Sequence, residues 1–492
     1  MKAWPKYPTI HELNTWVWLG DLNAKYGQVV SLATVPDQEW DAIAAYGVDA
    51  VWLMGVWERS PAGVEISMQN AGLLEDFRKA LPDFAPVDNV GSPYCVRRYV
   101  VDTHLGGPEG LAAARAALAV RDIRLITDFV ANHVAPDHPS VTEHPEYFIQ
   151  GTADDARNDP ASFMDVGGRV FALGRDPGYP AWPDVLQLNV FAPGLRRTVV
   201  DTLSRIAAQC DGVRCDMAML VLNDIFERTW GSRAGARPAD EYWATLIPAI
   251  KAKHPGFKFI AEVYWDLEWQ LQQQGCDYCY DKKFFDRATH GTAESIRQHL
   301  LADSGYQERL IRFLENHDEP RAAAVFPGEQ GRAAAVTLLT LPSARLLYQG
   351  QFDGHRVKLP VFLGRRPKEA GDHDLTAFYG QLLRAVDREL FRNGDWRLCQ
   401  ADGWPDNQSY QHVLAWCWDK GDARAITVVN WSNQSAQARI KVPWDEPGGR
   451  WRLSDLLSGE QFDRDGSEMR EAGLYVDLGP WRYHLFQCTP GP

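Results

Sequence analysis

The sequence predicts an α/β fold, a parallel β/α barrel followed by an antiparallel β domain, from three observations. Short apolar runs alternate with helical stretches from about residue 15 to residue 390, as in β/α units around a barrel. Four of these runs end in charged or imidazole side chains, and the strand ends of a parallel barrel share one face. After about residue 392 the chain changes to short β-rich runs separated by Gly, Asp and Asn, which is typical of antiparallel sheets.

The predicted elements of the barrel follow one another along the chain. We expect strands over residues 14–19, 50–57, 123–128, 212–216, 257–261, 310–314 and 345–348. We expect helices over residues 108–119, 193–209 and 375–386, the first two with a proline in the first turn. Between residues 133 and 184 the pattern gives way to Pro, Gly, Asp and isolated aromatics. A loop this long inside a compact domain is usually functional.

Composition limits the class of protein. The 492 residues predict two or three domains, and an apolar content of 45% is ample for a large core. The net charge of −14 argues against nucleic acid or an anionic membrane as the main partner. The N-terminus has no apolar stretch of signal-peptide length, and no run is long enough to cross a bilayer. We therefore expect a cytoplasmic protein with no membrane partner; composition does not predict the oligomeric state.

Four motifs carry the candidate chemistry. In chain order they read DFVANH at 128–133, GVRCD at 212–216, AEVYW at 261–265 and FLENHD at 313–318. They place three carboxylates after different strands, together with one Arg and two His, which is the inventory for cleaving a glycosidic bond. Any one motif occurs by chance, but four in this order are specific.

These motifs resemble those of the α-amylase family, glycoside hydrolase family 13. Residues 47–53 are similar to the family's second barrel strand and residues 182–189 to an additional motif, so the resemblance covers nearly the whole chain. It implies a (β/α)8 TIM barrel with a small inserted domain after the third strand and a C-terminal antiparallel β-sandwich domain. The implied ranges are 1–133 and 186–391 for the barrel, 134–185 for the inserted domain and 392–492 for the C-terminal domain.

The resemblance also implies a role for each candidate residue. Asp216 corresponds to the nucleophile, Glu262 to the acid/base, and Asp318 to the carboxylate that orients the sugar hydroxyls. The residues expected to bind substrate or to support its binding are Arg214, His133, His317, Tyr94, Asp128 and Tyr264. A retaining enzyme holds the nucleophile and the acid too close together for a water molecule to lie between them.

Strand geometry and electrostatics add two expectations to these roles. Arg214 precedes Asp216 by two residues, so on a strand both side chains point to the same face and can form a charge-assisted hydrogen bond. Glu262 must keep its proton near neutral pH, which a weakly polar surrounding favours. Asp128 is expected to brace Arg214 or the strand end.

Two departures from the family pattern shape the functional prediction. Residues 217–220 read MAML where many α-amylases have a Lys-His pair, which favours short substrates over starch. The early loop at residues 21–25 lacks the dense Asp/Asn spacing of a calcium loop. We therefore expect no metal ion and no cofactor.

The sequence supports one leading hypothesis and two alternatives. The leading one is a retaining α-glycosidase that hydrolyses α-glucosidic bonds in short glucosides or oligosaccharides, with a small-molecule carbohydrate as its only expected partner. A transglycosylase or isomerising glucosyltransferase would use the same covalent glycosyl-enzyme, and the sequence does not separate it from a hydrolase. A non-catalytic relative, such as the ectodomains of amino-acid transporter heavy chains, is disfavoured because all three carboxylates are present.

Overall fold

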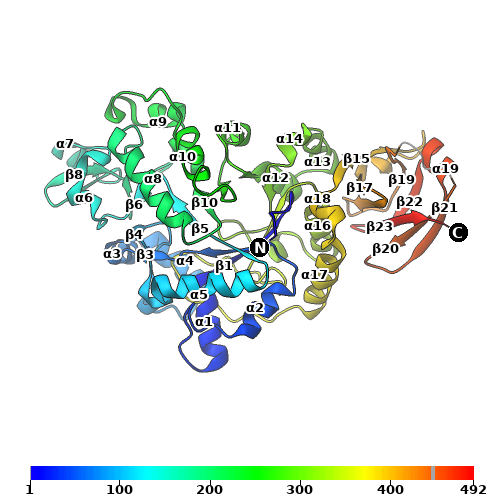
Figure 1. Ribbon diagram of the computed structural model, residues 1–492, viewed down its shortest axis with the longest axis horizontal. Coiled ribbons are helices and arrows are strands. Elements are labelled where there is room, and N and C mark those ends of the chain that lie inside the picture. The colour runs from blue at the N-terminus through cyan, green and yellow to red at the C-terminus, as the bar shows by residue number, and fades with distance from the viewer. Residues whose placement is uncertain (1, 445–448, 492) are drawn as a thin grey trace.

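Eight parallel strands close into a barrel, as predicted (Figure 1). The computed structural model describes residues 2–444 and 449–491. The strands are buried almost throughout, which explains why they read as apolar runs and not as alternating ones. In order around the barrel they are β1 (Thr9–Asn14), β14 (Ala344–Tyr348), β13 (Leu310–Arg312), β12 (Tyr278–Tyr280), β11 (Lys258–Ala261), β10 (Gly212–Asp216), β5 (Arg124–Val130) and β2 (Ala50–Met54).

The first barrel strand lies earlier than the sequence predicts. The predicted strand over residues 14–19 is wrong: β1 ends at Asn14, and the next residues form α1 (Thr15–Tyr26). An apolar run this short suits a buried strand and a buried helix equally well. The Asn14 side chain accepts a hydrogen bond from the Val17 N–H and so starts the helix. The sixth strand, β12, is also absent from the prediction, because its three residues lie between Asp277 and Asp281 and belong to no longer apolar run.

Helices surround the barrel and include those expected from the sequence. The predicted helices 108–119, 193–209 and 375–386 correspond to α5 (Gly107–Val120), α8 (Pro193–Ala207) and α17 (His373–Val386). Other barrel helices are α2 (Asp37–Ala44), α10 (Tyr242–Lys251), α12 (Lys282–His290), α13 (Ala293–Leu300) and α16 (Glu329–Thr340). Within the described residues, no helix combines the length and the apolar character needed to span a membrane.

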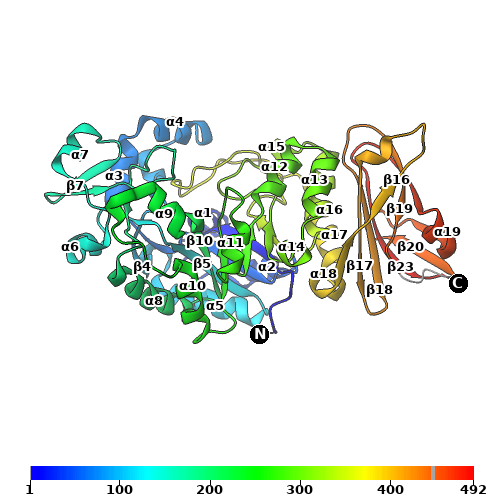
Figure 2. The same cartoon turned by 90° about the horizontal axis from the view of Figure 1, so that it is seen from above.

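Two insertions leave the barrel on the side opposite the C-terminal sheets (Figures 1 and 2). The segment after β5 contains α6 (Ser140–Glu143), α7 (Ala153–Asn158) and the hairpin of β7 (Phe163–Val166) and β8 (Arg169–Ala172). The segment begins at β6 (His133–Val134) and ends at β9 (Leu186–Gln187). These two strands pair with each other, and after β9 the chain returns to the barrel. The other insertion follows β2 and was not predicted; it comprises β3 (Trp57–Arg59), α3 (Pro61–Gln69), α4 (Ala71–Ala80) and β4 (Val96–Val101).

The C-terminal region forms two antiparallel sheets, as predicted. One has the order β15 (Asp395–Leu398), β17 (Val413–Lys420), β18 (Ala423–Asn430), β23 (Tyr483–Pro490), β20 (Arg450–Asp455) and β21 (Gln461–Asp465). The other has the order β16 (Gln400–Asp402), β19 (Ala436–Lys441) and β22 (Leu474–Leu478). Trp416 and Trp418 of β17 attach the larger sheet to the barrel, because both indole N–H groups donate to Thr340 at the end of α16.

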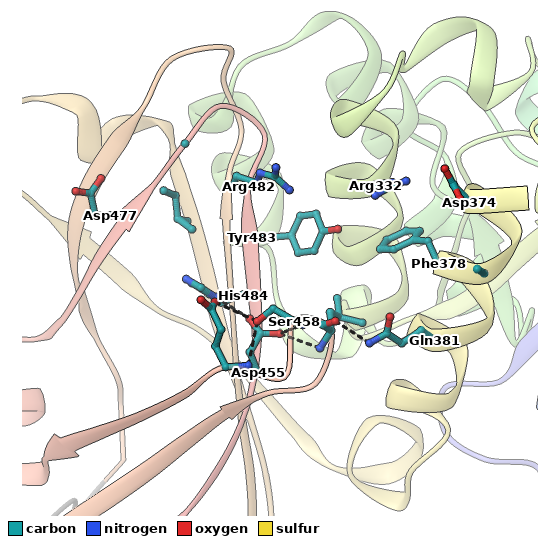
Figure 3. A pocket seen from close by; sticks show the side chains of 15 residues that line it. Arg332, Asp374, Phe378, Gln381, Asp455, Ser458, Asp477, Arg482, Tyr483 and His484 are labelled. Carbon is teal, nitrogen blue, oxygen red and sulfur yellow. Dashed lines mark hydrogen bonds and ion pairs between the residues drawn. The ribbon is translucent and has the colours of Figure 1, made fainter. Parts of the chain in front are cut away.

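A cavity of about 690 Å³ lies between α17 and the C-terminal strands (Figure 3). The rings of Phe378 and Tyr483 line it and pack against each other, with centroids 6.2 Å apart. The Gln381 amide bridges the two parts of the chain by donating to the carbonyls of Leu456 and Leu457. The lining residues come from α16, α17 and the C-terminal strands, so this cavity is separate from the barrel end that carries the candidate site.

Candidate active site

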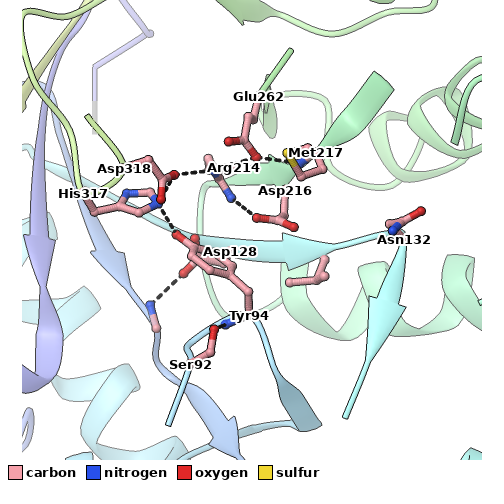
Figure 4. A network of polar contacts seen from close by, with 12 residues as sticks. Ser92, Tyr94, Asp128, Asn132, Arg214, Asp216, Met217, Glu262, His317 and Asp318 are labelled. Atoms are coloured by element: carbon pink, nitrogen blue, oxygen red, sulfur yellow. Dashed lines mark hydrogen bonds and ion pairs between the residues drawn. The ribbon is translucent and has the colours of Figure 1, made fainter. Parts of the chain in front are cut away.

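The ends of four barrel strands bring the predicted residues to one place (Figure 4). Arg214 and Asp216 lie in β10, Glu262 follows β11, and Asp318 follows β13. Asp128, in the neighbouring β5, is paired in register with Arg214. Because all these strands are parallel, their carboxyl ends lie at the same rim of the barrel.

Arg214 stands at the centre of the three carboxylates. Its Nη1 is 2.5 Å from Asp216 Oδ1, and its Nη2 is 2.8 Å from Glu262 Oε2 and 3.8 Å from Asp318 Oδ2. A planar guanidinium presents its donors in a fixed fork, so it sets the directions from which the carboxylates approach. The rings of Trp52, Tyr94 and Tyr280 surround it, with centroids 5.0–5.7 Å from Arg214 Cζ. The buried guanidinium of Arg214 therefore holds the carboxylates of Asp216 and Glu262 close to each other.

Glu262 has the properties of a proton donor near neutral pH. Burial raises the pKa of Glu262 to about 7, with Arg214 opposing the shift and the negative charges of Asp216 and Asp318 supporting it. Its Oε2 accepts a hydrogen bond from the Met217 backbone N–H at 2.6 Å, and its Oε1 accepts one from the Tyr264 hydroxyl at 2.9 Å. These two donors fix the orientation of the carboxyl group toward Arg214.

Met217 reaches Glu262 because its backbone is left-handed, with φ at +44°. This conformation costs a residue with a side chain roughly 1 kcal/mol or more. The sharp turn directly after β10 directs the Met217 N–H at the carboxylate, where an extended backbone would continue the strand. The sequence pointed to residues 217–220 only for substrate length and did not predict this backbone contact.

Asp318 and His317 form a charged pair at the open side of the site. His317 Nε2 lies 2.8 Å from Asp318 Oδ2 and 2.7 Å from the Tyr94 hydroxyl. Burial works against the charge on Asp318, but His317 lowers the pKa of Asp318 to about 2. The Asp318 side chain is 42% exposed, whereas His317 is buried. An ionised and accessible carboxylate in this place can accept hydrogen bonds from a ligand's hydroxyl groups.

The remaining predicted residues surround these groups. His133 Nε2 is 4.0 Å from Asp216 Oδ2, and burial lowers the pKa of His133. Asp128 is fully buried, where it accepts hydrogen bonds from the Trp52 indole (3.1 Å) and the Gly55 N–H (2.7 Å). Burial also raises the pKa of Asp128 to about 6. The carboxylate thus braces β2 against β5 and lies beneath the site.

Four further residues lie at the site: Glu12, Tyr280 and Lys358 were not anticipated from the sequence, whereas Trp182 belongs to the segment 182–189 noted there. Glu12 contacts the far side of the His317 ring and was missed because the first strand was placed two residues after it. Tyr280 lies in the strand that was not predicted. Lys358, whose ammonium group donates to the Asp318 carbonyl, comes from a loop without a regular pattern. Trp182 is the aromatic of the insertion whose ring lies beside His133, at 5.1 Å between centroids.

Two cavities flank the carboxylates. One of about 500 Å³ lies beside His317 and Asp318 and is walled by α4 and residues 357–362. The other, of about 460 Å³, begins at Tyr264 and Trp265 and extends along α12. Trp265 has a left-handed backbone and is 41% exposed. A ligand that spans the carboxylates therefore has room on both sides.

The side chain of Asn132, next to His133, is held by hydrogen bonds to Gln187. Gln187 Nε2 donates to Asn132 Oδ1 at 2.9 Å, and Asn132 Nδ2 lies 3.2 Å from Gln187 Oε1. A hard cation needs several oxygen ligands, and this amide pair uses the oxygen of Asn132 for itself. Over residues 2–444 and 449–491 no group of three His, Cys, Asp or Glu side chains is placed to hold a metal ion. The absence of a metal ion and a cofactor stays a prediction.

Comparisons with known proteins agree with this geometry. No family model matches the sequence. The chain is 23% identical over 471 residues to α-amylase MalA of Haloarcula japonica, covering 93% of this chain and 59% of that protein. A shorter match, 25% identical over 190 residues, is to the α-1,4-glucan:maltose-1-phosphate maltosyltransferase of Burkholderia pseudomallei and covers 37% of this chain and 14% of that protein. The chain thus spans less than two thirds of the length of these curated relatives.

A solved structure shows the same fold over the whole chain. The noncanonic maltogenic α-amylase AmyB of Thermotoga neapolitana superimposes with a TM-score of 0.71 and 18% identity, covering 98% of each chain. At this identity the likeness shows the fold, and the sequence match to α-amylase MalA covers 93% of the chain. The four motifs at the strand ends resemble those of the α-amylase family, glycoside hydrolase family 13, and the similar sequence and the similar fold both carry the name of an α-amylase.

Proposed function

We propose that the protein is a retaining α-glycosidase that hydrolyses α-glucosidic bonds, in short glucosides or oligosaccharides in preference to starch. The observation that carries this proposal is the arrangement around Arg214, whose guanidinium contacts both Asp216 and Glu262 and faces Asp318. The names of the relatives, an α-amylase and a maltogenic α-amylase, support an activity on α-linked glucose polymers or fragments. A non-catalytic protein would not need three carboxylates converging on one buried cation.

In this proposal each group takes a step in a two-step displacement. Glu262, protonated near neutrality, gives its proton to the glycosidic oxygen while the Asp216 carboxylate bonds to the anomeric carbon, and the bond to the leaving group breaks. The ionised Glu262 then takes a proton from water, whose oxygen displaces Asp216 from the anomeric carbon. Asp318 and His317 hold the hydroxyls of the same sugar through hydrogen bonds that strengthen in the transition state.

The proposed preference for short substrates is based on the residues and cavities next to the three carboxylates. Met219 and Leu220, which stand in the Lys-His region of many α-amylases, are buried and apolar and give an extended chain no donors. Remote contacts that would raise the rate on long substrates are therefore few on this side. The two flanking cavities, of about 500 and 460 Å³, have the size for one or a few sugar units on each side.

A transglycosylase or isomerising glucosyltransferase is the second candidate, and two observations favour it. A relative carries the name of a maltosyltransferase. The exposed Trp265 also lies at the mouth of the cavity next to Glu262, where an acceptor sugar could stack on its ring. Incubation with maltose distinguishes the two activities: free glucose alone indicates hydrolysis, whereas new oligosaccharides or isomers indicate transfer.

The stereochemistry and the length preference can be measured together. We expect the first product to be the α-anomer, because two displacements at the anomeric carbon retain its configuration. We also expect a disaccharide or small α-glucoside to be cleaved with a higher kcat/KM than soluble starch, compared per cleavable bond. Proton NMR of the earliest product and side-by-side initial rates give the two answers. An initial β-anomer would overturn the mechanism, whereas faster internal cleavage of starch would overturn only the length preference.

The pH profile should respond to Tyr264. We expect kcat/KM to fall about tenfold per pH unit above about pH 7, because deprotonated Glu262 has no proton to donate. The Tyr264 hydroxyl donates to Glu262 and so favours its charged form. Tyr264→Phe should therefore raise the pKa of Glu262 and move the basic limb to higher pH by roughly half to one unit.

The matched control is Tyr242→Phe. The Tyr242 hydroxyl is also buried, but it makes no hydrogen bond within the described part of the chain. This variant should leave the basic limb in place. A Tyr264→Phe profile that shifts to lower pH, or that coincides with the profile of the unchanged protein, would contradict the assignment of the basic limb to Glu262.

A further inference from the structure

Glu12 is a buried carboxylate that touches the site from behind. It lies in β1, where it is paired in register with Trp52 of β2 and Tyr348 of β14, and it is fully buried. Its Oε1 is 2.5 Å from His317 Nδ1. Its Oε2 is buried and has no hydrogen-bond partner among the described residues. The imidazole of His317 is therefore the group that compensates the charge of Glu12.

His317 is held between two carboxylates. Its Nδ1 faces Glu12, and its Nε2 faces Asp318 at 2.8 Å and the Tyr94 hydroxyl at 2.7 Å. An ionised carboxylate only accepts hydrogen bonds, and a neutral imidazole has one donor and one acceptor nitrogen. When both carboxylates are ionised, their contacts of 2.5 and 2.8 Å with the ring are both satisfied only if each ring nitrogen carries a proton.

We propose that Glu12 is a positioning residue that keeps His317 doubly protonated, so that the Nε2–H group permanently orients Asp318 and the sugar hydroxyls beside it. The role in catalysis rests on the proposed glycosidase function; the charge state of His317 does not. Glu12 touches no substrate in this arrangement, since it is fully buried behind the imidazole ring. It acts through His317.

The energetic reason is the cost of an unpaired buried charge. If His317 lost a proton, Glu12 would remain as an anion in the barrel interior with one oxygen already unpartnered, which is strongly unfavourable. The charges of Glu12 and His317 therefore stabilise each other. The ring is also fixed in place, because Tyr94 and Trp52 lie against it with centroids 5.4 and 5.5 Å away.

The charged groups around the pair support the same charge state. Burial opposes the imidazolium, yet Asp318 and Glu12 raise the pKa of His317 to about 10. The charge of His317 also acts to lower the pKa of Asp128 in β5. Arg214 of β10 lies 3.8 Å from the Asp318 carboxylate. The titratable groups that face Glu12 from the neighbouring elements are Tyr280 of β12, Glu315 after β13 and Tyr348 of β14.

The first test is a titration of the unchanged protein. Histidine labelled with ¹³C and ¹⁵N allows the imidazole of His317 to be followed by NMR, and a His317→Gln variant assigns its signal. We expect this ring to stay charged well above neutral pH, up to about pH 9. A ring that titrates near the ordinary value of 6.5 would overturn the inference, whatever the enzymatic activity of the protein.

The second test replaces the charge while keeping the shape. In Glu12→Gln, the pKa of His317 should fall toward its ordinary value, because one of its two anionic partners is gone. We expect kcat/KM on an α-glucoside to fall about tenfold to a hundredfold, mostly through kcat, as for a lost hydrogen bond to a charged group. A lowered pKa with unchanged kinetics would disprove the positioning role, and an unchanged pKa would disprove the charge coupling.

Glu315→Gln is the matched control. Glu315 is equally buried and precedes His317 by two residues, but its carboxylate pairs with Arg321 at 3.1 Å and accepts the Ala322 N–H. This variant should leave the pKa of His317 near 10 and the activity within a few-fold, even where the melting temperature drops. An equal loss of activity in both variants would show that Glu12 has only a structural role. Should Glu12→Gln fail to fold, the titration of the unchanged protein still decides the charge state.

Discussion

Asp216→Asn is expected to lower kcat by at least about 1000-fold while leaving the fold intact. The change is nearly isosteric, but an amide cannot attack the anomeric carbon as a carboxylate does. It also removes the charge that faces Arg214 Nη1 at 2.5 Å, so the guanidinium is left with Glu262 and the more distant Asp318. Initial rates on an activated aryl α-glucoside measure the loss, because this substrate makes the first step as easy as possible.

The control uses the same substitution at the other end of the same strand. Asp211 stands just before β10, where its carboxylate pairs with Arg115 at 2.7 Å, far from the strand ends that carry the site. Asp211→Asn should change the melting temperature more than the rate. Residual activity above a tenth in Asp216→Asn, with circular dichroism unchanged, would contradict the assignment of Asp216 as nucleophile.

The fold was predictable where the sequence pattern fits only one type of secondary structure. The strand β2 reads AVWLM, is wholly apolar and is followed directly by Gly55, so its pattern predicts a short buried strand. Residues 14–19 fit both a buried strand and a buried helix. The hydrogen bond from the Val17 N–H to the Asn14 side chain favours the helix. Asn is a residue type favoured at helix N-caps, so the sequence carried a signal for this helix that the strand prediction did not use. The insertion formed by β3, α3, α4 and β4 carries no apolar period strong enough to stand out.

The candidate site was predictable to the extent that its residues belong to linear motifs. Arg214 and Asp216 are two residues apart on one strand, so their contact follows from strand geometry. Glu12 and His317 are 305 residues apart, and only the closure of the barrel brings β1 beside the loop after β13. The same holds for Tyr280, which reaches Arg214 from a strand of three residues. Contacts that barrel closure creates are the part that sequence patterns do not contain.

Glu262→Gln should show a loss that depends on the leaving group. Glutamine keeps the hydrogen bonds to the Met217 N–H and the Tyr264 hydroxyl within reach, but it has no proton to give to the glycosidic oxygen. On maltose, whose leaving group needs protonation, we expect kcat/KM to fall roughly 100- to 10,000-fold. On an aryl glucoside with an acidic phenol, bond cleavage proceeds without that proton, so the first step should slow by less than about tenfold.

Glu268→Gln provides the comparison for this result. Glu268 is buried like Glu262, and burial likewise raises the pKa of Glu268 to about 7, but it lies in α11 (Glu268–Gln273), away from Arg214. Its loss should affect both substrates equally and weakly. The basic limb near pH 7 should persist in Glu268→Gln and disappear in Glu262→Gln, because only Glu262 supplies the titrating proton. Equal losses on maltose and on the activated glucoside in Glu262→Gln would show that this carboxyl group is not the acid.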